Sequence, residues 1–209
     1  MLLAFDTATA HVTVALNDRG SVVASFESGE PMRHGEMLAP GIQRVLAEAG
    51  ATAKDLTGIA VGVGPGPFTG LRVGLVTART LALVRGIPVH GVCSLDILAA
   101  AGVDAGLEEF VVATDARRKE VYLASYAGGR RVSGPEVVKP FDERTELPVL
   151  GRGAVLYPQA FPNAAGPEHP SAVALADVVL NERFEILASD PLYLRRPDAV
   201  EPGKPKRVS

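Results

Sequence analysis

The chain has 209 residues, of which 47% are hydrophobic and 22% are charged, a composition typical of a globular protein with one large core or two small ones. A net charge of −3 argues against a protein that attracts nucleic acid or membrane through an overall positive field. The single cysteine excludes an internal disulfide and a multi-cysteine zinc site.

The apolar stretches also limit where the protein works. They are interrupted by Arg or Gly and are too short to span a bilayer, and the N-terminus lacks the pattern of a signal peptide. We therefore expect a cytoplasmic protein with no membrane contact. Cys93 lies in an apolar run, which favours a buried structural thiol over a nucleophile.

The first half of the chain has the pattern of a small sheet followed by helices. Three strand-like segments predict a meander, and an amphipathic segment closed by Gly50 predicts a helix. A glycine- and proline-rich turn then leads to a second helix, a strand and a short helix, for which Ser94 is the expected N-cap. In chain order these segments are 1–5, 12–16, 21–26, 33–49, 57–63, 64–70, 71–85, 89–92 and 94–101.

The pattern restarts near residue 103. An apolar run again ends in Asp, a second strand follows, and a glycine turn closes the hairpin. Placing Asp6 on Asp115 also places Val12 on Val121, which indicates an internal duplication. Two copies of a meander followed by α/β units predict an α/β, actin-like (ASKHA superfamily) fold of two duplicated lobes. The second lobe is reduced in helices, because only 171–180 has a clear helical pattern there.

These observations predict three regions. Residues 1–102 form an N-terminal actin-like lobe that carries the dimerisation helices, and residues 103–196 form a smaller C-terminal lobe. Residues 197–209 contain several prolines and basic residues and are expected to be a flexible tail.

The glycine-rich turn is not a complete phosphate-binding motif. The segment 64–70 lacks the lysine of a P-loop, and Pro65 and Pro67 remove two backbone N–H groups that would hold an anion. We therefore interpret Gly64, Gly66 and Gly70 as a structural turn that fixes a helix against a sheet.

The two Asp-containing loops look like degraded phosphate loops. Active actin-like proteins usually have glycine two residues after the first Asp, whereas Ala8 follows Asp6 at that position. Asp115 is followed by Arg117, Arg118 and Lys119 with no glycine. No nucleotide cofactor is expected, and these three cations could meet an acidic partner or an RNA phosphate. A solvated charged loop is the alternative.

No catalytic or metal site is evident. His34 begins a predicted helix, but Leu38 stands four residues later, where a second metal-binding histidine would be needed. A helix-cap or surface role is therefore favoured for His34, and no nucleophile motif accompanies Cys93.

The helix predicted at 71–85 is apolar nearly all round its axis. A helix that covers a sheet should have a polar outer face, so this pattern indicates burial on both sides. We expect a second protein chain to cover the outer side, although a wholly intramolecular core is the alternative. The predicted contacts are Met37, Leu38, Arg72, Leu75 and Arg79.

The segment 62–74 resembles the signature of the TsaB (YeaZ) family, which reads close to G-x-GPGSFTGLR-x-G, with Pro67 here in place of the usual Ser. Further segments are similar to the family's motifs in the same order: 6–9, 33–36, 92–95, 115–122 and 191–195.

The resemblance implies a non-catalytic paralogue of TsaD, the subunit that transfers a threonylcarbamoyl group to N6 of adenosine 37 in tRNAs reading ANN codons. It implies a heterodimer with TsaD, association with the ATPase TsaE, a homodimer when alone and at most an indirect or minor tRNA contact. It implies neither a metal nor a cofactor.

Two alternatives stay open. One is a metal-dependent peptidase-like or ATP-binding enzyme. The other is an RNA-binding module that uses the 117–119 cations together with Arg195, Arg196, Lys204, Lys206 and Arg207.

Overall fold

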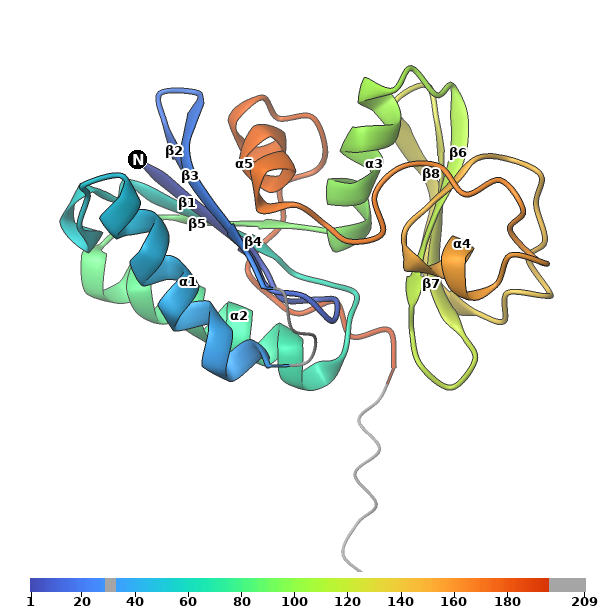
Figure 1. Cartoon of the computed structure of the whole chain (residues 1–209), viewed down its shortest axis with the longest axis horizontal. Coiled ribbons are helices and arrows are strands. Elements are labelled where there is room, and N and C mark those ends of the chain that lie inside the picture. The colour runs from blue at the N-terminus through green and yellow to red at the C-terminus, as the bar shows by residue number, and fades with distance from the viewer. Residues whose placement is uncertain (29–32, 196–209) are drawn as a thin grey trace, which may run out of the picture.

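The computed structural model describes residues 1–28 and 33–195, arranged as two lobes side by side (Figure 1). The expected tail at 197–209, which carries Lys204, Lys206 and Arg207, lies outside these residues, and so does Arg196. No helix in the described part of the chain combines the length and the apolar character needed to cross a bilayer.

The first lobe is built on a five-stranded sheet. Its strands are β1 (Leu2–Asp6), β2 (Thr13–Asp18), β3 (Ser21–Glu27), β4 (Gly58–Gly62) and β5 (Val89–Val92), in the order β3-β2-β1-β4-β5. β1 pairs with β2 antiparallel and with β4 parallel. The helices α1 (His34–Glu48) and α2 (Phe68–Arg85) cover one face, and the short 3-10 helix η1 (Ala53–Asp55) connects α1 to β4.

The second lobe repeats this plan. Its strands are β6 (Glu109–Asp115), β7 (Val121–Ala127), β8 (Arg130–Val138) and β9 (Val149–Leu150), in the order β8-β7-β6-β9. β6 pairs with β7 antiparallel and with β9 parallel, as β1 does with β2 and β4. The predicted α/β, actin-like architecture of two duplicated lobes is therefore confirmed.

Both central strands are buried on both faces, which explains their continuous apolar sequences. In β1, Leu3 and Phe5 join the core beneath α1 and α2, while Leu2 and Ala4 point to the opposite face. In β6, alternate residues join two separate cores in the same way, one with α3 (Ser94–Asp104) and one with α4 (Arg152–Leu156).

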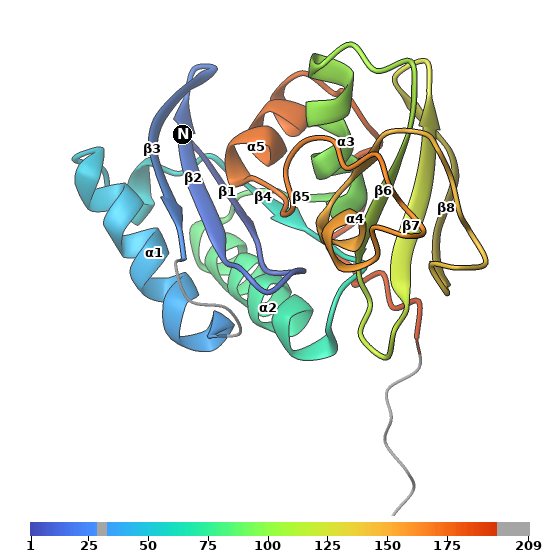
Figure 2. The same cartoon turned by 45° about the vertical axis from the view of Figure 1, so that its right-hand side comes forward.

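Two helices each pack on the sheet formed by the other half of the sequence. α5 (Ala172–Leu180) comes late in the chain but packs on β1 and β2 of the first sheet, and α3 comes from the first half but packs on β6. The two helices also contact each other between the lobes (Figure 2). The helix expected at 171–180 is therefore present, but it covers the first sheet and not the second. The lobe boundary at residue 102 stays a prediction.

Three local expectations need correction. α2 begins at Phe68 rather than at residue 71, since Pro67 already holds the N-cap position. The short helix α4 was not anticipated. Ser94 is the first residue of α3 and caps nothing, because its hydroxyl bonds to Asp6 instead; Cys93 holds the cap position.

We predict that Leu175→Ala in α5 lowers the free energy of unfolding by about 2–5 kcal/mol, because the side chain is fully buried against the first sheet. The matched control is Val173→Ala on the same helix, where the side chain is 38% exposed and the expected change is within about 0.5 kcal/mol. Urea unfolding measures both, and equal losses would contradict this packing.

Candidate functional site

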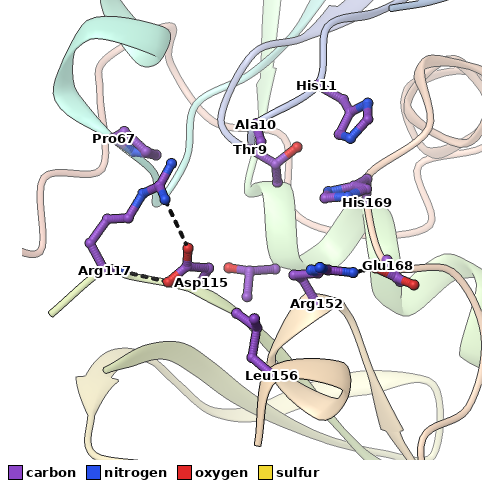
Figure 3. Close-up of a pocket in the computed structure, with 11 residues that line it drawn as sticks. Thr9, Ala10, His11, Pro67, Asp115, Arg117, Arg152, Leu156, Glu168 and His169 are labelled. Carbon is purple, nitrogen blue, oxygen red and sulfur yellow. Dashed lines mark hydrogen bonds and ion pairs between the residues drawn. The ribbon is translucent and has the colours of Figure 1, made fainter. Parts of the chain in front are cut away.

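A cleft of about 540 Å³ lies between the lobes and is the candidate site (Figure 3). One wall is the loop after β1 and the facing wall is the end of β6 with its following loop, so the duplicated hairpins face each other across it. The side chains that line it are Thr9, Ala10, His11 and Pro67 from the first lobe, and Thr114, Asp115, Arg117, Arg152, Leu156, Glu168 and His169 from later in the chain.

The two duplicated aspartates make the same local turn. Asp6 Oδ1 accepts from the Ala8 N–H at 2.7 Å, and Asp115 Oδ1 accepts from the Arg117 N–H at 2.8 Å. Their environments differ, because the Asp115 side chain is 28% exposed in the cleft whereas Asp6 is only 1% exposed. Asp6 therefore cannot reach a ligand in the cleft.

Asp6 is instead part of a buried hydrogen-bond network. The Ser94 hydroxyl donates to Asp6 Oδ2 at 2.6 Å and accepts from the Gly64 N–H at 3.2 Å. Burial raises the pKa of Asp6. A Cβ at Gly62 would lie 1.7 Å from Asp6 Oδ2, so only glycine fits beside this carboxyl group. The network joins β1, β4 and α3.

The glycine turn packs directly on the loop after β1. A Cβ at Gly66 would lie 2.3 Å from the Ala8 carbonyl oxygen, and one at Gly70 would lie 2.4 Å from the Thr7 carbonyl oxygen. The Thr7 hydroxyl in turn donates to the Gly70 carbonyl at 2.8 Å. The loop after β1 thus fills the space beside both glycines. This geometry supports the interpretation of the turn as structural.

The guanidinium groups in the cleft are matched by carboxylates. Arg117 Nη1 lies 3.5 Å from Asp115 Oδ2, and Arg152 forms an ion pair with Glu168 (Figure 3). A phosphate site needs an excess of positive charge or of backbone donors. The cleft is therefore poorly suited to a nucleotide polyphosphate.

Two histidines face each other in the cleft (Figure 3). The ring centroids of His11 and His169 are 4.3 Å apart, and His11 Nδ1–H donates to the Ser28 carbonyl at 3.0 Å. Burial, and then the neighbouring His11, lower the pKa of His169 to about 4. His169 Nδ1 is buried with no hydrogen-bond partner among the described residues. His169 is therefore neutral near pH 7.

His34 is a buried structural residue, so its expected role as a helix cap or surface residue is wrong. It is 4% exposed, and its Nε2–H donates to the Thr9 carbonyl at 2.6 Å. Within residues 1–28 and 33–195, no group of three or more His, Cys, Asp or Glu side chains is arranged to hold a metal. The buried, inert Cys93 is confirmed, since it is fully buried and its pKa is raised to about 12, mainly by burial.

The predicted interface residues fall into three groups. Leu38 and Leu75 are 1% and 3% exposed and hold α1 and α2 on the sheet, so their assignment to the surface is corrected. Met37 is half-buried against the same core. Arg72 and Arg79 lie on one exposed stripe of α2, as expected from their spacing.

That arginine stripe is engaged by the C-terminal segment, residues 187–195. Arg79 pairs with Asp190 at 2.6 Å, and Arg72 Nε donates to the Tyr193 hydroxyl at 3.4 Å. The outward apolar residues of α2 are others: Val76, Leu83 and Val84, which are 60%, 84% and 75% exposed. They belong to the all-round apolar pattern, but only the packing shows which side faces the sheet.

The basic residues Arg117, Arg118 and Lys119 form a left-handed turn. Their φ angles are 62°, 55° and 61°, a conformation that costs a non-glycine residue about 1 kcal/mol or more. The Ala116 N–H donates to the Glu120 carbonyl and the Glu120 N–H to the Arg117 carbonyl, both at 3.0 Å, so the turn closes the hairpin. All three side chains are exposed.

Comparison with known proteins identifies close relatives. Residues 31–182 match a family model described as TsaD, tRNA N6-adenosine threonylcarbamoyltransferase. An uncharacterized protein of Mycobacterium tuberculosis is 42% identical over 204 residues, covering 95% of this chain and 93% of the relative. The tRNA threonylcarbamoyladenosine biosynthesis protein TsaB of Escherichia coli is 40% identical over 126 residues, covering 60% of this chain and 54% of the relative.

A solved structure agrees with these sequence matches. YeaZ from Pseudomonas aeruginosa superposes with a TM-score of 0.77 at 30% identity, covering 92% of this chain and 99% of that one.

We predict that Gly70→Ala lowers the free energy of unfolding by about 2–3 kcal/mol, because the new methyl group would overlap the Thr7 carbonyl oxygen and the backbone would have to shift. Gly35→Ala on α1 is the control, since nothing lies within 4 Å of its Cβ position and alanine favours a helix. Thermal and urea unfolding measure both. A Gly70→Ala variant as stable as the control would refute close packing of the turn.

We also predict an acid-dependent loss of stability from His169. Its folded pKa of about 4 lies below the ordinary value of 6.5, so the unfolded state takes up the proton first as the pH falls. The stabilisation is complete above about pH 6.5 and is lost as the pH falls toward 4. Melting temperatures of wild type and His169→Gln at pH 7 and pH 4.5 isolate this effect. A difference between the two proteins that does not change with pH would exclude it.

Proposed function

The chain belongs to the TsaD/TsaB family and within it to the TsaB (YeaZ) type, and we propose that it is the non-catalytic partner subunit of the complex that transfers a threonylcarbamoyl group to N6 of adenosine 37 in tRNA. It takes part in the biosynthesis of tRNA threonylcarbamoyladenosine, as its TsaB relatives do by name. The proposal adds that TsaD supplies the catalytic site and that this chain acts by binding TsaD.

The absence of a catalytic role is supported by the contacts that His34 and Asp6 make within the chain. His34 is bound to the Thr9 carbonyl, and Leu38, one helical turn later, is in the core. Asp6 is sealed under the glycine turn, and Ala8 contacts Gly66. The groups that would bind a metal or a phosphate in an enzyme of this fold are thus occupied by contacts within the chain.

The single observation that carries the proposal is the outer side of α2. Its inner side already packs on the sheet through Leu71, Leu75 and Ala78. Val76 and Leu83, which are 60% and 84% exposed, nevertheless point outward, away from the sheet. Contiguous exposed apolar side chains mark protein–protein contacts. α1 and α2 together offer a helical surface for TsaD, to which Met37, Arg72 and Arg79 contribute at the edges.

The same surface would serve a homodimer of the isolated chain, because a helical pair can pack on its own copy as well as on a paralogue. Association with the ATPase TsaE remains a prediction from the family resemblance. A cytoplasmic location fits a tRNA-modifying role and likewise remains a prediction.

We predict that Val76→Glu/Leu83→Glu weakens the complex with TsaD at least about tenfold, because two carboxylates would be buried in an apolar contact. Val22→Glu is the control, since Val22 is also exposed, at 44%, but lies on β3 away from α2. Isothermal titration calorimetry with purified TsaD measures both. Equal weakening by both variants would mean that α2 is not the contact.

The same proteins test the function in a reconstituted reaction with tRNA, ATP, threonine, bicarbonate and the partner subunits. Modification should require this chain, should fall with Val76→Glu/Leu83→Glu, and should be absent with this chain alone. Equal modification without the chain would refute the proposal, and turnover by the isolated chain would refute its non-catalytic part.

A further inference from the structure

The C-terminal segment, residues 187–195, is held by both lobes (Figures 1 and 2). Just before it, Phe184 packs edge-on against Tyr126 of β7, with ring centroids 6.1 Å apart. The segment then contacts β5 and α2 of the first lobe. At its end, Arg195 forms an ion pair with Glu120 of the β6–β7 loop in the second lobe. This short stretch of chain therefore crosses between the lobes twice.

Backbone hydrogen bonds fix the segment on the first lobe. The Leu187 N–H donates to the Gly91 carbonyl at 2.8 Å, and the Gly91 N–H donates to the Leu187 carbonyl at 2.9 Å. Further along, the Leu192 N–H donates to the Val63 carbonyl at 2.9 Å. A Cβ at Gly91 would lie 2.5 Å from the Ala188 carbonyl oxygen, so this close approach to β5 depends on glycine.

Two leucines of the segment join the cores of the lobes. The side chains of Leu187 and Leu192 pack against the core beneath α1 and α2, and also against the core that α3 forms with β6. If the segment moved away from either lobe, these side chains would lose apolar contacts and become exposed to water. A shift of one lobe is therefore transmitted to the segment.

Each lobe also holds the segment by an ion pair. Asp190 pairs with Arg79 of α2 at 2.6 Å, but Asp190 is 80% exposed, so this pair contributes little in water. Arg195 and Glu120 are 26% and 29% exposed, and Arg195 also donates to the Ala116 carbonyl at 2.8 Å. A half-buried pair is screened less than an exposed one. The contact with the second lobe is therefore the firmer of the two.

The β6–β7 loop needs such support. Residues 117–119 all have positive φ angles, and a strained backbone of this kind persists only where its surroundings hold it in place. Arg195 contacts the loop on both sides of this turn, at Ala116 and at Glu120. Release of Arg195 should therefore loosen the loop.

We propose that the C-terminal segment couples the α2 surface to the β6–β7 loop, so that a protein bound on α2 stabilises the loop and an ordered loop raises the affinity for that protein. A partner at the edge of α2 would cover the Arg79–Asp190 pair and remove it from water, which strengthens the hold of the first lobe on the segment. The contiguous packing and hydrogen bonds of the segment carry this effect to Arg195. Such coupling is reciprocal. The inference rests on the proposed function, which supplies TsaD as the partner.

The first test follows the hydrogen exchange of single backbone amides in the isolated chain by NMR. The Ala116 and Glu120 amides report on the loop and the Leu187 amide reports on the segment, since each donates a hydrogen bond. Arg195→Gln should raise the exchange rate of the Leu187 amide at least about threefold, and Gly91→Ala should do the same for the two loop amides. Each variant is thus read at the far end of the segment.

Two matched variants are the controls. Gly58→Ala changes a glycine of the neighbouring strand β4, where the new methyl group would have no neighbour closer than 3.4 Å. Arg144→Gln removes an exposed cation of the second lobe outside the segment. Melting temperatures check folding, and Arg195→Gln decides the question if Gly91→Ala does not fold. A change confined to the mutated end of the segment, or equal changes in the controls, would overturn the inference.

The second test measures TsaD binding by isothermal titration calorimetry. Arg195→Gln and Gly91→Ala should each weaken binding at least about fivefold, although Gly91 is buried in β5 and cannot touch a partner. Arg144→Gln should bind as wild type does. Wild-type affinity of Arg195→Gln would overturn the coupling. If the wild type itself does not bind TsaD, the proposed function fails, whereas the exchange rates still decide whether the segment links the lobes.

Discussion

The rest of the structure depends on the contact between the glycine turn and the loop after β1. Backbone meets backbone there, since a Cβ at Gly66 or Gly70 would overlap the carbonyl oxygen of Ala8 or Thr7. Gly62, at the end of β4, lies equally close to the Asp6 carboxyl group. The Ser94 hydroxyl bridges Asp6 to the Gly64 N–H and ties α3 to the same point. This contact sets the start of α2 and the inner edge of the cleft.

The two copies of the Asp-containing loop have different environments in the two lobes. In the first lobe the aspartate is buried and is a structural group, while in the second it is only half-buried and is followed by three exposed cations. The two aspartates keep the same hydrogen bond to the backbone two residues on. One copy of the loop therefore supports the fold, and the other places positive charge at the surface.

The C-terminal segment connects the two lobes. It pairs with β5 through Leu187 and Gly91, forms an ion pair with Arg79 of α2 through Asp190, and stacks Tyr193 on Phe68 at the start of α2. Arg195 then reaches the β6–β7 loop, where it donates to the Ala116 carbonyl at 2.8 Å. The helix α2 and the β6–β7 loop are thus linked by a few consecutive residues of this segment.

The sequence by itself determined the elements, the duplication and the family, because strand runs, helix periodicity and a turn of glycines and prolines are local signals. It also determined that α2 has more apolar surface than one sheet can bury. Only the tertiary structure decided which of those side chains face outward: Leu38 and Leu75 went to the core, and Val76 and Leu83 to the surface. It likewise decided that α5 covers the first sheet, that the Ser94 hydroxyl bonds to Asp6 instead of capping α3, and that Tyr193 stacks on Phe68. These pairings join residues far apart in the chain, and a local pattern carries no information about which distant surface will meet it.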